Sequence, residues 1–231
     1  MTLDDLAARI AGCRQCPRLV VWREEVGVTK RAAFRDEDYW ARPVPGFGDP
    51  EATVLVVGLA PAAHGANRTG RMFTGDRSGD WLYRAMFRAG FASQPTSQHR
   101  GDGLSLTGAY VTAAVRCAPP ANKPAAEEKT NCAPWLDAEL ELLKSMSVIV
   151  ALGNIGYTAT MQAMTRRGVE VPRPRPRFAH GGEVRLDGLT VLSSYHPSQQ
   201  NTFTGRLTEP MFDAVFSRAR ELSRSPSGGS D

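Results

Sequence analysis

Residues 53–61 read TVLVVGLAP, a continuous apolar run that ends in glycine and proline. This pattern is typical of a strand buried on both faces of a parallel sheet. Further apolar runs of this kind follow at residues 109–120, 147–153 and 189–198. Helices are predicted between the strands, at residues 79–90, 134–144 and 154–167. This alternation predicts right-handed βαβ units and an open α/β sheet that is covered on both faces.

Length and composition favour one large globular domain. The chain has 231 residues, of which 42% are hydrophobic and 23% are charged, enough for a substantial core. We expect the domain to span residues 1–222, followed by a disordered tail at 223–231. No apolar run approaches the roughly 18 residues that a membrane span needs, and the N-terminus lacks the apolar segment of a secretory signal. We therefore expect a cytoplasmic protein without a membrane anchor.

The basic residues are almost all arginines. The formal net charge is only +4, yet 24 of the 28 Lys and Arg residues are Arg, the side chain best suited to bidentate phosphate and base contacts. Residues 166–177, RRGVEVPRPRPR, place five of them in an extended, proline-rich segment. We interpret this segment as a DNA-phosphate arm that includes Arg173 and Arg175. A GC-rich coding sequence would produce the same excess of arginine.

The cysteines form two pairs. Cys13 and Cys16 are separated by two residues, and Cys117 and Cys132 by fourteen. Disulfides are disfavoured in the cytosol, so a CxxC pair within a set of four thiols favours a metal site. Four thiolates can complete a tetrahedral zinc site or hold one cubane iron–sulfur cluster. The spacing alone does not choose between these two.

Three loops follow predicted strands and should meet at the carboxyl edge of the sheet, where such folds bind ligands. The first is GLAPAAHGANRTGRMFTGD at 58–76, the second is RCAPPANKP at 116–124, and the third is SYHPSQQNTFTGR at 194–206. The first loop has no Walker or GxGxxG pattern, so nothing favours a bound nucleotide cofactor. In the third loop, His196 follows an apolar strand and could act as an acid, a base or a hydrogen-bond donor.

The remaining segments are predicted with less detail. A short helix at 3–12 should deliver the CxxC pair, and residues 26–50, rich in Gly, Pro and aromatics, should form a long ordered loop. Pro134 should lie near the start of its helix. His99 and His180 are expected at the surface.

The strand and loop motifs together resemble the uracil-DNA glycosylase superfamily. More narrowly, the four cysteines in CxxC…C-x14-C order resemble the iron–sulfur B-type, or fifth, family. The resemblance covers about residues 10–220. It implies an α/β/α sandwich around a four-stranded parallel sheet, and it places Cys13, Cys16, Cys117 and Cys132 as ligands of a structural [4Fe-4S] cluster, with zinc as the alternative.

The same resemblance implies hydrolysis of the N-glycosidic bond of a damaged base flipped out of DNA. Phe73 matches the aromatic residue on which the base stacks. His196 matches the histidine that stabilises the departing base anion. Asp76, in FTGD, is expected to stabilise the sugar cation and position the water. An alternative for Asp76 is a helix N-cap.

The first loop departs from the uracil-specific families. Residues 58–63, GLAPAA, lack the polar residue that activates water there, a feature shared with the B-type family. Residues 112–114, TAA, replace the Asn that reads the base edge, so specificity should extend beyond uracil to bases such as hypoxanthine. Ala60, His64 and Asn122 are the remaining candidates for contact with the base.

The expected partner is double-stranded DNA that contains uracil or another damaged base, bound by a monomer. Polar side chains of the first and third loops and of the arm are the expected DNA contacts: Arg68, Arg71, Ser198, Gln199, Asn201, Arg206, Arg173 and Arg175. Two other functions stay open at this point. One is a catalytically inactive DNA-binding module, and the other is a zinc-stabilised nucleoside hydrolase.

Overall fold

The computed structural model describes residues 1–224 and contains a central sheet of six strands in the order β1-β3-β2-β4-β6-β5. The four inner strands run parallel, and they are β3 (Ala109–Ala113), β2 (Val54–Gly58), β4 (Val148–Leu152) and β6 (Leu189–Ser194). They confirm the predicted four-stranded parallel sheet. Two short antiparallel strands, β1 (Phe47–Gly48) and β5 (Glu183–Leu186), close its edges and were not predicted.

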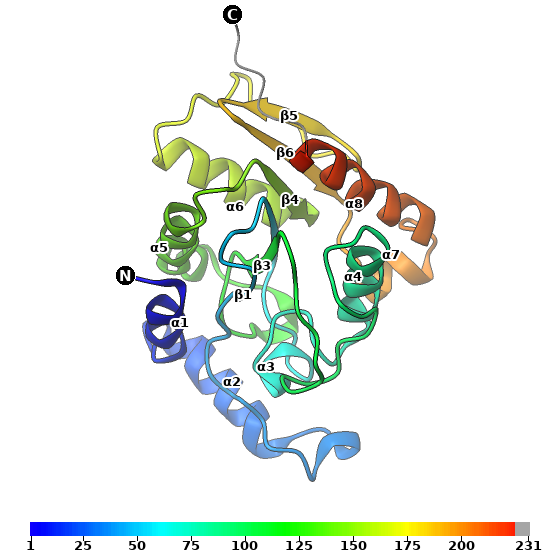
Figure 1. Ribbon diagram of the computed structural model, residues 1–231. Coiled ribbons are helices and arrows are strands. Elements are labelled where there is room, and N and C mark those ends of the chain that lie inside the picture. Colours follow the sequence, from blue (N-terminus) through cyan, green and yellow to red (C-terminus); the bar gives the residue numbers. More distant parts are fainter. Residues whose placement is uncertain (225–231) are drawn as a thin grey trace, which may run out of the picture.

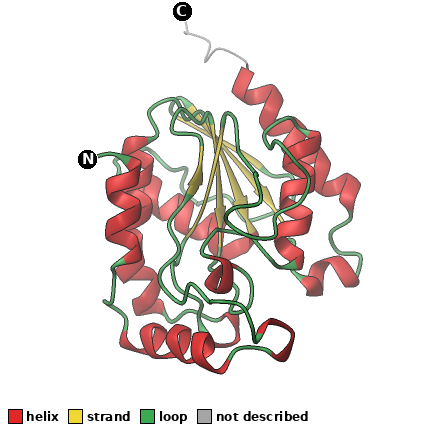
Figure 2. Cartoon of the chain, turned by 60° about the horizontal axis from the view of Figure 1, so that its bottom comes forward, coloured by secondary structure: helices red, strands yellow, loops and turns green. Residues whose placement is uncertain are grey.

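Helices cover both faces of the sheet (Figures 1 and 2). Strand β2 shows why both faces must be covered. Its side chains are all apolar and point alternately to the two faces of the sheet, into two separate cores. Val54 and Val56 pack in a core with Phe212 and Phe216 of one layer, whereas Leu55 and Val57 belong to the opposite core. The first layer contains α4 (Arg77–Arg88) and α8 (Glu209–Arg224), and the second contains α5 (Ala126–Leu142) and α6 (Gly153–Arg166). The structure is therefore the predicted α/β/α sandwich.

Shorter elements complete the chain. Two helices at the N-terminus, α1 (Leu3–Ala11) and α2 (Pro17–Thr29), flank the CxxC pair. The loops at the carboxyl edge contain α3 (Ala66–Thr69), α7 (Gln199–Phe203) and a 3-10 turn at Pro120–Asn122, and a further 3-10 turn lies at Ala32–Phe34. None of the helices in residues 1–224 has the length and apolar character needed to cross a membrane.

Several predicted boundaries were wrong. Helix α5 begins at Ala126, so Pro134 lies inside the helix, and Cys132 sits on it. Residues 26–29 belong to α2, where a loop had been predicted. Helix α8 continues through Ser223 and Arg224, so the predicted tail does not begin at 223, and its residues 225–231 lie outside the described part of the chain.

Candidate active site

The three predicted loops meet at one cavity of about 570 Å³ beyond the carboxyl ends of β2, β3 and β6. Parallel strands deliver their following loops to one edge of a sheet, so residues far apart in the chain converge there. Seven residues singled out from the sequence line this cavity: Ala60, Phe73, Asp76, Asn122, His196, Ser198 and Gln199.

Phe73 is held with its ring against the end of β2. Its backbone has φ +52°, a left-handed conformation that is uncommon outside glycine and is found at functional sites. A Cβ on Gly58 would lie 2.6 Å from Phe73 Cζ, so only glycine allows this approach. The ring centroid lies 5.9 Å from that of His196, at an interplanar angle of 30°. Phe73 and His196 therefore face the same space from different loops.

His196 follows β6 and is half-buried. Burial lowers its pKa to about 4, so its imidazole is neutral at physiological pH and carries one N–H donor. Asn201 Nδ2 donates to the His196 carbonyl oxygen at 2.8 Å. Tyr195, just before it, stacks on the half-buried His180 ring, with centroids 5.1 Å apart, and donates its N–H to His180 Nδ1 at 3.2 Å. The expectation that His180 lies at the surface was therefore wrong.

Asp76 caps α4 and also lines the cavity. Its Oδ1 accepts the N–H of Gly79 at 3.1 Å. Burial raises the pKa of its carboxyl above the ordinary value, against the lowering effect of the Gly79 and Ser78 N–H groups. The structure therefore shows the predicted cap and places the desolvated carboxyl at the cavity, while its catalytic role stays a prediction.

The cysteines are gathered at a second site, and all four line one small cavity between α2, α5 and the segment after β3. Arg23, which is only 2% exposed, donates to Cys117 Sγ at 2.9 Å. Burial raises the pKa of the Cys117 thiol to about 12. No group of three or more metal-ligating side chains is poised for a single ion within residues 1–224, and all four cysteines are free thiols.

The uracil DNA glycosylase superfamily model matches residues 45–220. The chain belongs to the uracil-DNA glycosylase superfamily. It is 54% identical over 224 residues to a protein of Thermus thermophilus named Type-5 uracil-DNA glycosylase, covering 96% of this chain and 99% of the relative. A protein of the same name from Mycobacterium tuberculosis is 52% identical, covering 96% and 82%. A Type-4 uracil-DNA glycosylase of Pyrobaculum aerophilum is 30% identical, covering 86% and 84%. These findings confirm the predicted resemblance.

Two arginines of the first loop, which we expected to contact DNA, are buried and form ion pairs within the protein. Arg68 is paired with Glu37 and donates to the carbonyl oxygens of His64 and Gly75 at 2.9 and 3.0 Å. Arg71 is 4% exposed and paired with Asp102. We therefore reassign both from DNA contact to the structure of the loop, a role that sequence could not reveal because their acidic partners, Glu37 and Asp102, are distant in the chain.

The other predicted contacts are distributed around the rim and beyond it. His64 is not among the cavity-lining residues and shares a 3.0 Å hydrogen bond with Tyr39. Arg206 is exposed and stacks 4.5 Å from the Tyr195 ring centroid. Arg173 and Arg175 are exposed on a separate face that they share with the end of α6.

Arg77 is a rim residue that sequence reasoning missed. It lines the cavity, is exposed, and holds its guanidinium 4.3 Å from the ring centroid of Phe203, which is itself 67% exposed. Its position directly after FTGD was the available signal. The exposed Phe203 ring, which packs against the Arg77 guanidinium beside the cavity, is of a kind that can insert between stacked bases.

A Gly65→Ala substitution tests how closely the Asp76 carboxylate is packed. A Cβ at residue 65 would collide with Asp76 Oδ2 and must displace it. Because about 1 Å of misplacement can cost roughly 10²-fold in rate, we expect a loss of that order in single-turnover base release, with duplex binding retained. Gly12→Ala is the matched control, since its Cβ would meet nothing nearer than 3.7 Å and it does not line the cavity. Unchanged activity in Gly65→Ala would show that the Oδ2 position is not critical.

Proposed function

We propose that this protein is a DNA repair glycosylase that hydrolyses the N-glycosidic bond of uracil in DNA and leaves an abasic site. The observation that carries the proposal is the convergence of Phe73, neutral His196 and the desolvated Asp76 on one cavity. The names of the relatives support the same activity.

The cavity suits a base that has been flipped out of the duplex, because the target bond is inaccessible in the stack. The base would stack on Phe73. As the C1′–N1 bond breaks, its electron pair moves onto the base, and the His196 N–H stabilises the resulting anion. The cationic sugar is stabilised by the Asp76 carboxylate, which also takes a proton from the attacking water. Burial suits both side chains to these roles, because it raises the pKa of Asp76, which makes its carboxylate a stronger base, and lowers the pKa of His196, which keeps the imidazole neutral.

We further propose that the substrate range extends beyond uracil to bases such as hypoxanthine. The GLAPAA stretch presents Leu59, Ala60, Pro61 and Ala62 to the cavity, with no polar side chain. Thr112 does not supply the missing amide, because its hydroxyl donates to Glu139 at 2.7 Å inside the core. Asn122 is the polar side chain of the second loop at the cavity, and its φ of +55° marks a constrained position. A single exposed amide, such as that of Asn122, rejects other bases less strongly than a buried amide would.

The direct test is incubation of purified protein with labelled duplexes that contain one uracil or one hypoxanthine, followed by alkaline cleavage of abasic sites. We expect cleavage at both lesions and none in an undamaged duplex. Tight binding to the uracil duplex without abasic sites would instead identify a DNA-binding module that lacks the chemistry. Release of bases from free nucleosides would favour a nucleoside hydrolase.

The second site supports a bound [4Fe-4S] cluster held by Cys13, Cys16, Cys117 and Cys132. The cysteines share their cavity with Arg23 and Arg116, and the Nε atoms of both are buried without a hydrogen-bond partner within the described residues. An anionic cluster would add a charged partner for Arg23, which already donates to Cys117 Sγ, whereas Arg116 is ion-paired with Glu139. Four cysteines that line one cavity match the four thiolate ligands that such a cluster takes. The four cysteines would hold the cluster, which would cross-link the N-terminal pair, the segment after β3 and α5.

Replacing Cys132 with serine should remove most of the iron and destabilise the fold. Through the cluster, Cys132 would link α5 to the segment that carries Cys117 and to the N-terminal pair. Loss of the metal would therefore remove a cross-link between elements that are distant in the chain. We expect a melting temperature lowered by several degrees and an iron content well below four per chain, measured by metal analysis of freshly purified protein. Stoichiometric zinc in the unmodified protein would identify the alternative metal.

Duplex DNA is the proposed partner, with a monomeric protein bound across the cavity. Ser198, Gln199, Asn201 and Arg206 are the retained contacts on the α7 loop, and Arg77 is added to them. We propose the cytoplasm as the compartment, because reducing conditions keep cysteines available as metal ligands. We also propose that residues 1–222 act as a single domain.

The exposed arm is tested by the salt dependence of binding. If Arg173 and Arg175 each neutralise one phosphate, changing both to Gln should reduce the slope of log Kd against log salt by about 1.8, because each contact contributes about 0.9. Fluorescence anisotropy with a labelled duplex measures this slope. The double substitution of Arg185 and Arg218 to Gln, on β5 and α8, is a control of equal charge change. An equal slope in the arm variant and the unmodified protein would exclude the arm from the interface.

A further inference from the structure

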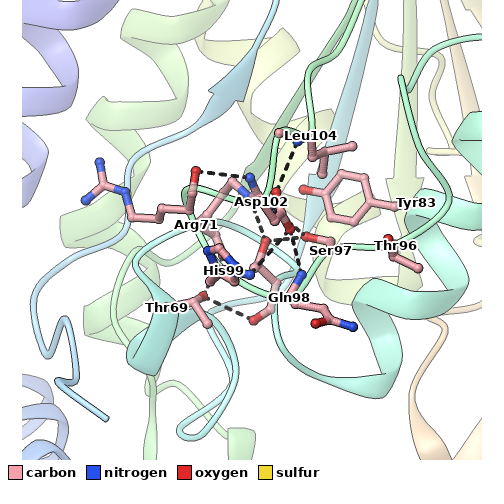
Figure 3. Close-up of polar contacts among 12 residues, drawn as sticks. Thr69, Arg71, Tyr83, Thr96, Ser97, Gln98, His99, Asp102 and Leu104 are labelled. Atoms are coloured by element: carbon pink, nitrogen blue, oxygen red, sulfur yellow. Dashed lines mark hydrogen bonds and ion pairs between the residues drawn. The ribbon is translucent and has the colours of Figure 1, made fainter.

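Arg71 lies at the centre of a buried polar network (Figure 3) and is not among the residues that line the cavity. Its Nη2 contacts both carboxylate oxygens of Asp102, at 2.8 and 2.7 Å, and Ser97 Oγ at 3.0 Å. Its Nε donates to Thr74 Oγ1 at 3.0 Å. The arginine therefore ties the loop to a segment about thirty residues further along the chain.

The distant segment, Ser97 to Leu104, is itself organised by Asp102. The Asp102 carboxylate accepts the N–H groups of Gln98 at 2.8 Å and Leu104 at 3.1 Å. Hydrogen bonding and charge from Arg71, together with these N–H groups, outweigh burial and hold the pKa of the carboxyl well below its usual range. The ion pair thus persists throughout the pH range in which the enzyme would work.

The network reaches the two active-site residues through the backbone between them. Ser97 Oγ and Thr74 Oγ1 are 2.7 Å apart, and Gly75 N donates to the Ser97 carbonyl at 2.9 Å. Thr74 and Gly75 are the residues that separate Phe73 from Asp76. Phe73 keeps its left-handed backbone only if surrounding contacts hold it there.

We propose that Arg71, Asp102, Ser97 and Thr74 form a positioning brace that holds the Phe73 ring and the Asp76 carboxylate in their reactive placement. The inference rests on the proposed glycosylase function and deepens it. None of the four touches the base in this arrangement. The brace acts through the backbone of residues 73–76, so its loss should lower the rate of bond cleavage more than the affinity for DNA.

Thr74 offers a matched pair of substitutions for the test. Thr74→Val keeps the shape and removes the hydroxyl, whereas Thr74→Ser keeps the hydroxyl. We expect Thr74→Val, and likewise Ser97→Ala, to lose about tenfold or more in single-turnover uracil release. Thr74→Ser should stay within about twofold of the unmodified protein, and Kd for a duplex with a non-cleavable uracil analogue should be unchanged in all three. Asp102→Asn should show a larger loss, but it leaves a buried guanidinium unpaired and can fail to fold.

Measuring the rate at a temperature where every variant is folded separates positioning from stability. Asp137→Asn, which breaks the Arg166–Asp137 pair between α5 and α6, is the control ion-pair variant and should keep the full rate. A Thr74→Val protein that keeps the full rate, or that loses rate only by weaker DNA binding, would overturn the brace. An unmodified protein without activity would refute the proposed function and the brace together, whereas an active protein with an unaffected Thr74→Val variant would refute the brace alone.

Discussion

Replacing Asp76 with asparagine should reduce uracil release by roughly a hundred- to ten-thousand-fold, the range typical of a lost general base. Asparagine keeps the shape of the side chain and an oxygen that can accept the Gly79 N–H, so the cap on α4 remains. It lacks the negative charge that stabilises the sugar cation and cannot take a proton from water. The loss would therefore be one of chemistry, with DNA binding retained.

The same substitution should raise stability near neutral pH. Burial raises the pKa of Asp76 in the folded protein above its unfolded value, so the folded state binds the proton more tightly. Its contribution to stability is full below the unfolded pKa, which is about 3.9 for aspartate, and is lost as the pH rises through the folded pKa. Asparagine carries no charge to desolvate, so Asp76→Asn should melt at a higher temperature than the unmodified protein at pH 7.

Asp76→Ala separates the cap from the charge. It should be as inactive as Asp76→Asn but less stable than Asp76→Asn by about 1 kcal/mol, the usual cost of removing an N-cap. Thermal unfolding and single-turnover kinetics on the three proteins measure both effects. Full activity in Asp76→Asn would reassign the residue as a cap alone.

The second large effect is expected at His196. Replacing it with alanine should slow uracil release by about 10²- to 10³-fold, as for loss of one preorganised donor to a developing anion. Because burial lowers the pKa of His196 to about 4, the imidazole is neutral above about pH 5, so the loss should be constant from there upward. An acid limb, where activity falls as pH decreases, should remain in His196→Ala because Asp76 with its raised pKa must be ionised.

A better leaving group provides a specific readout for His196. Duplexes with 5-fluorouracil, whose anion needs less stabilisation, should recover part of the rate in His196→Ala and gain less in the unmodified protein. His64→Ala is the control, since His64 is not among the residues that line the cavity. An equal gain from 5-fluorouracil in both proteins would indicate that His196 does not stabilise the departing base.

Some strands and helices could be predicted from the local sequence pattern, and others could not. The apolar run 53–61 correctly predicted β2, because a strand buried on both faces needs only apolar, β-branched residues. The edge strands β1 and β5 were not predicted, since β1 has two residues and β5 has only four, most of them not buried. Pro134 suggested a helix start, yet α5 runs through it, because packing overrides local propensity.

The candidate site also contains residues whose location was predicted from the sequence and residues whose location was not. Phe73, Asp76 and His196 stand in motifs that follow predicted strands, and parallel topology brings such loops to one edge. Arg71 looked like a DNA contact from its residue type alone. Its partner Asp102 is 31 residues away, so no local pattern showed that the charge was already neutralised inside the protein.

The positions of the four inner strands and the loops that follow them are encoded locally, in hydrophobic runs and short motifs, and could be read from the chain. The order of the strands in the sheet was not predicted and comes from the structure. The choice between a buried and a DNA-facing arginine, and the pKa values of Asp76 and His196, depend on what packs around each group. Desolvation and ion pairing depend on which groups lie nearby in the folded protein. Only the tertiary structure supplies those neighbours.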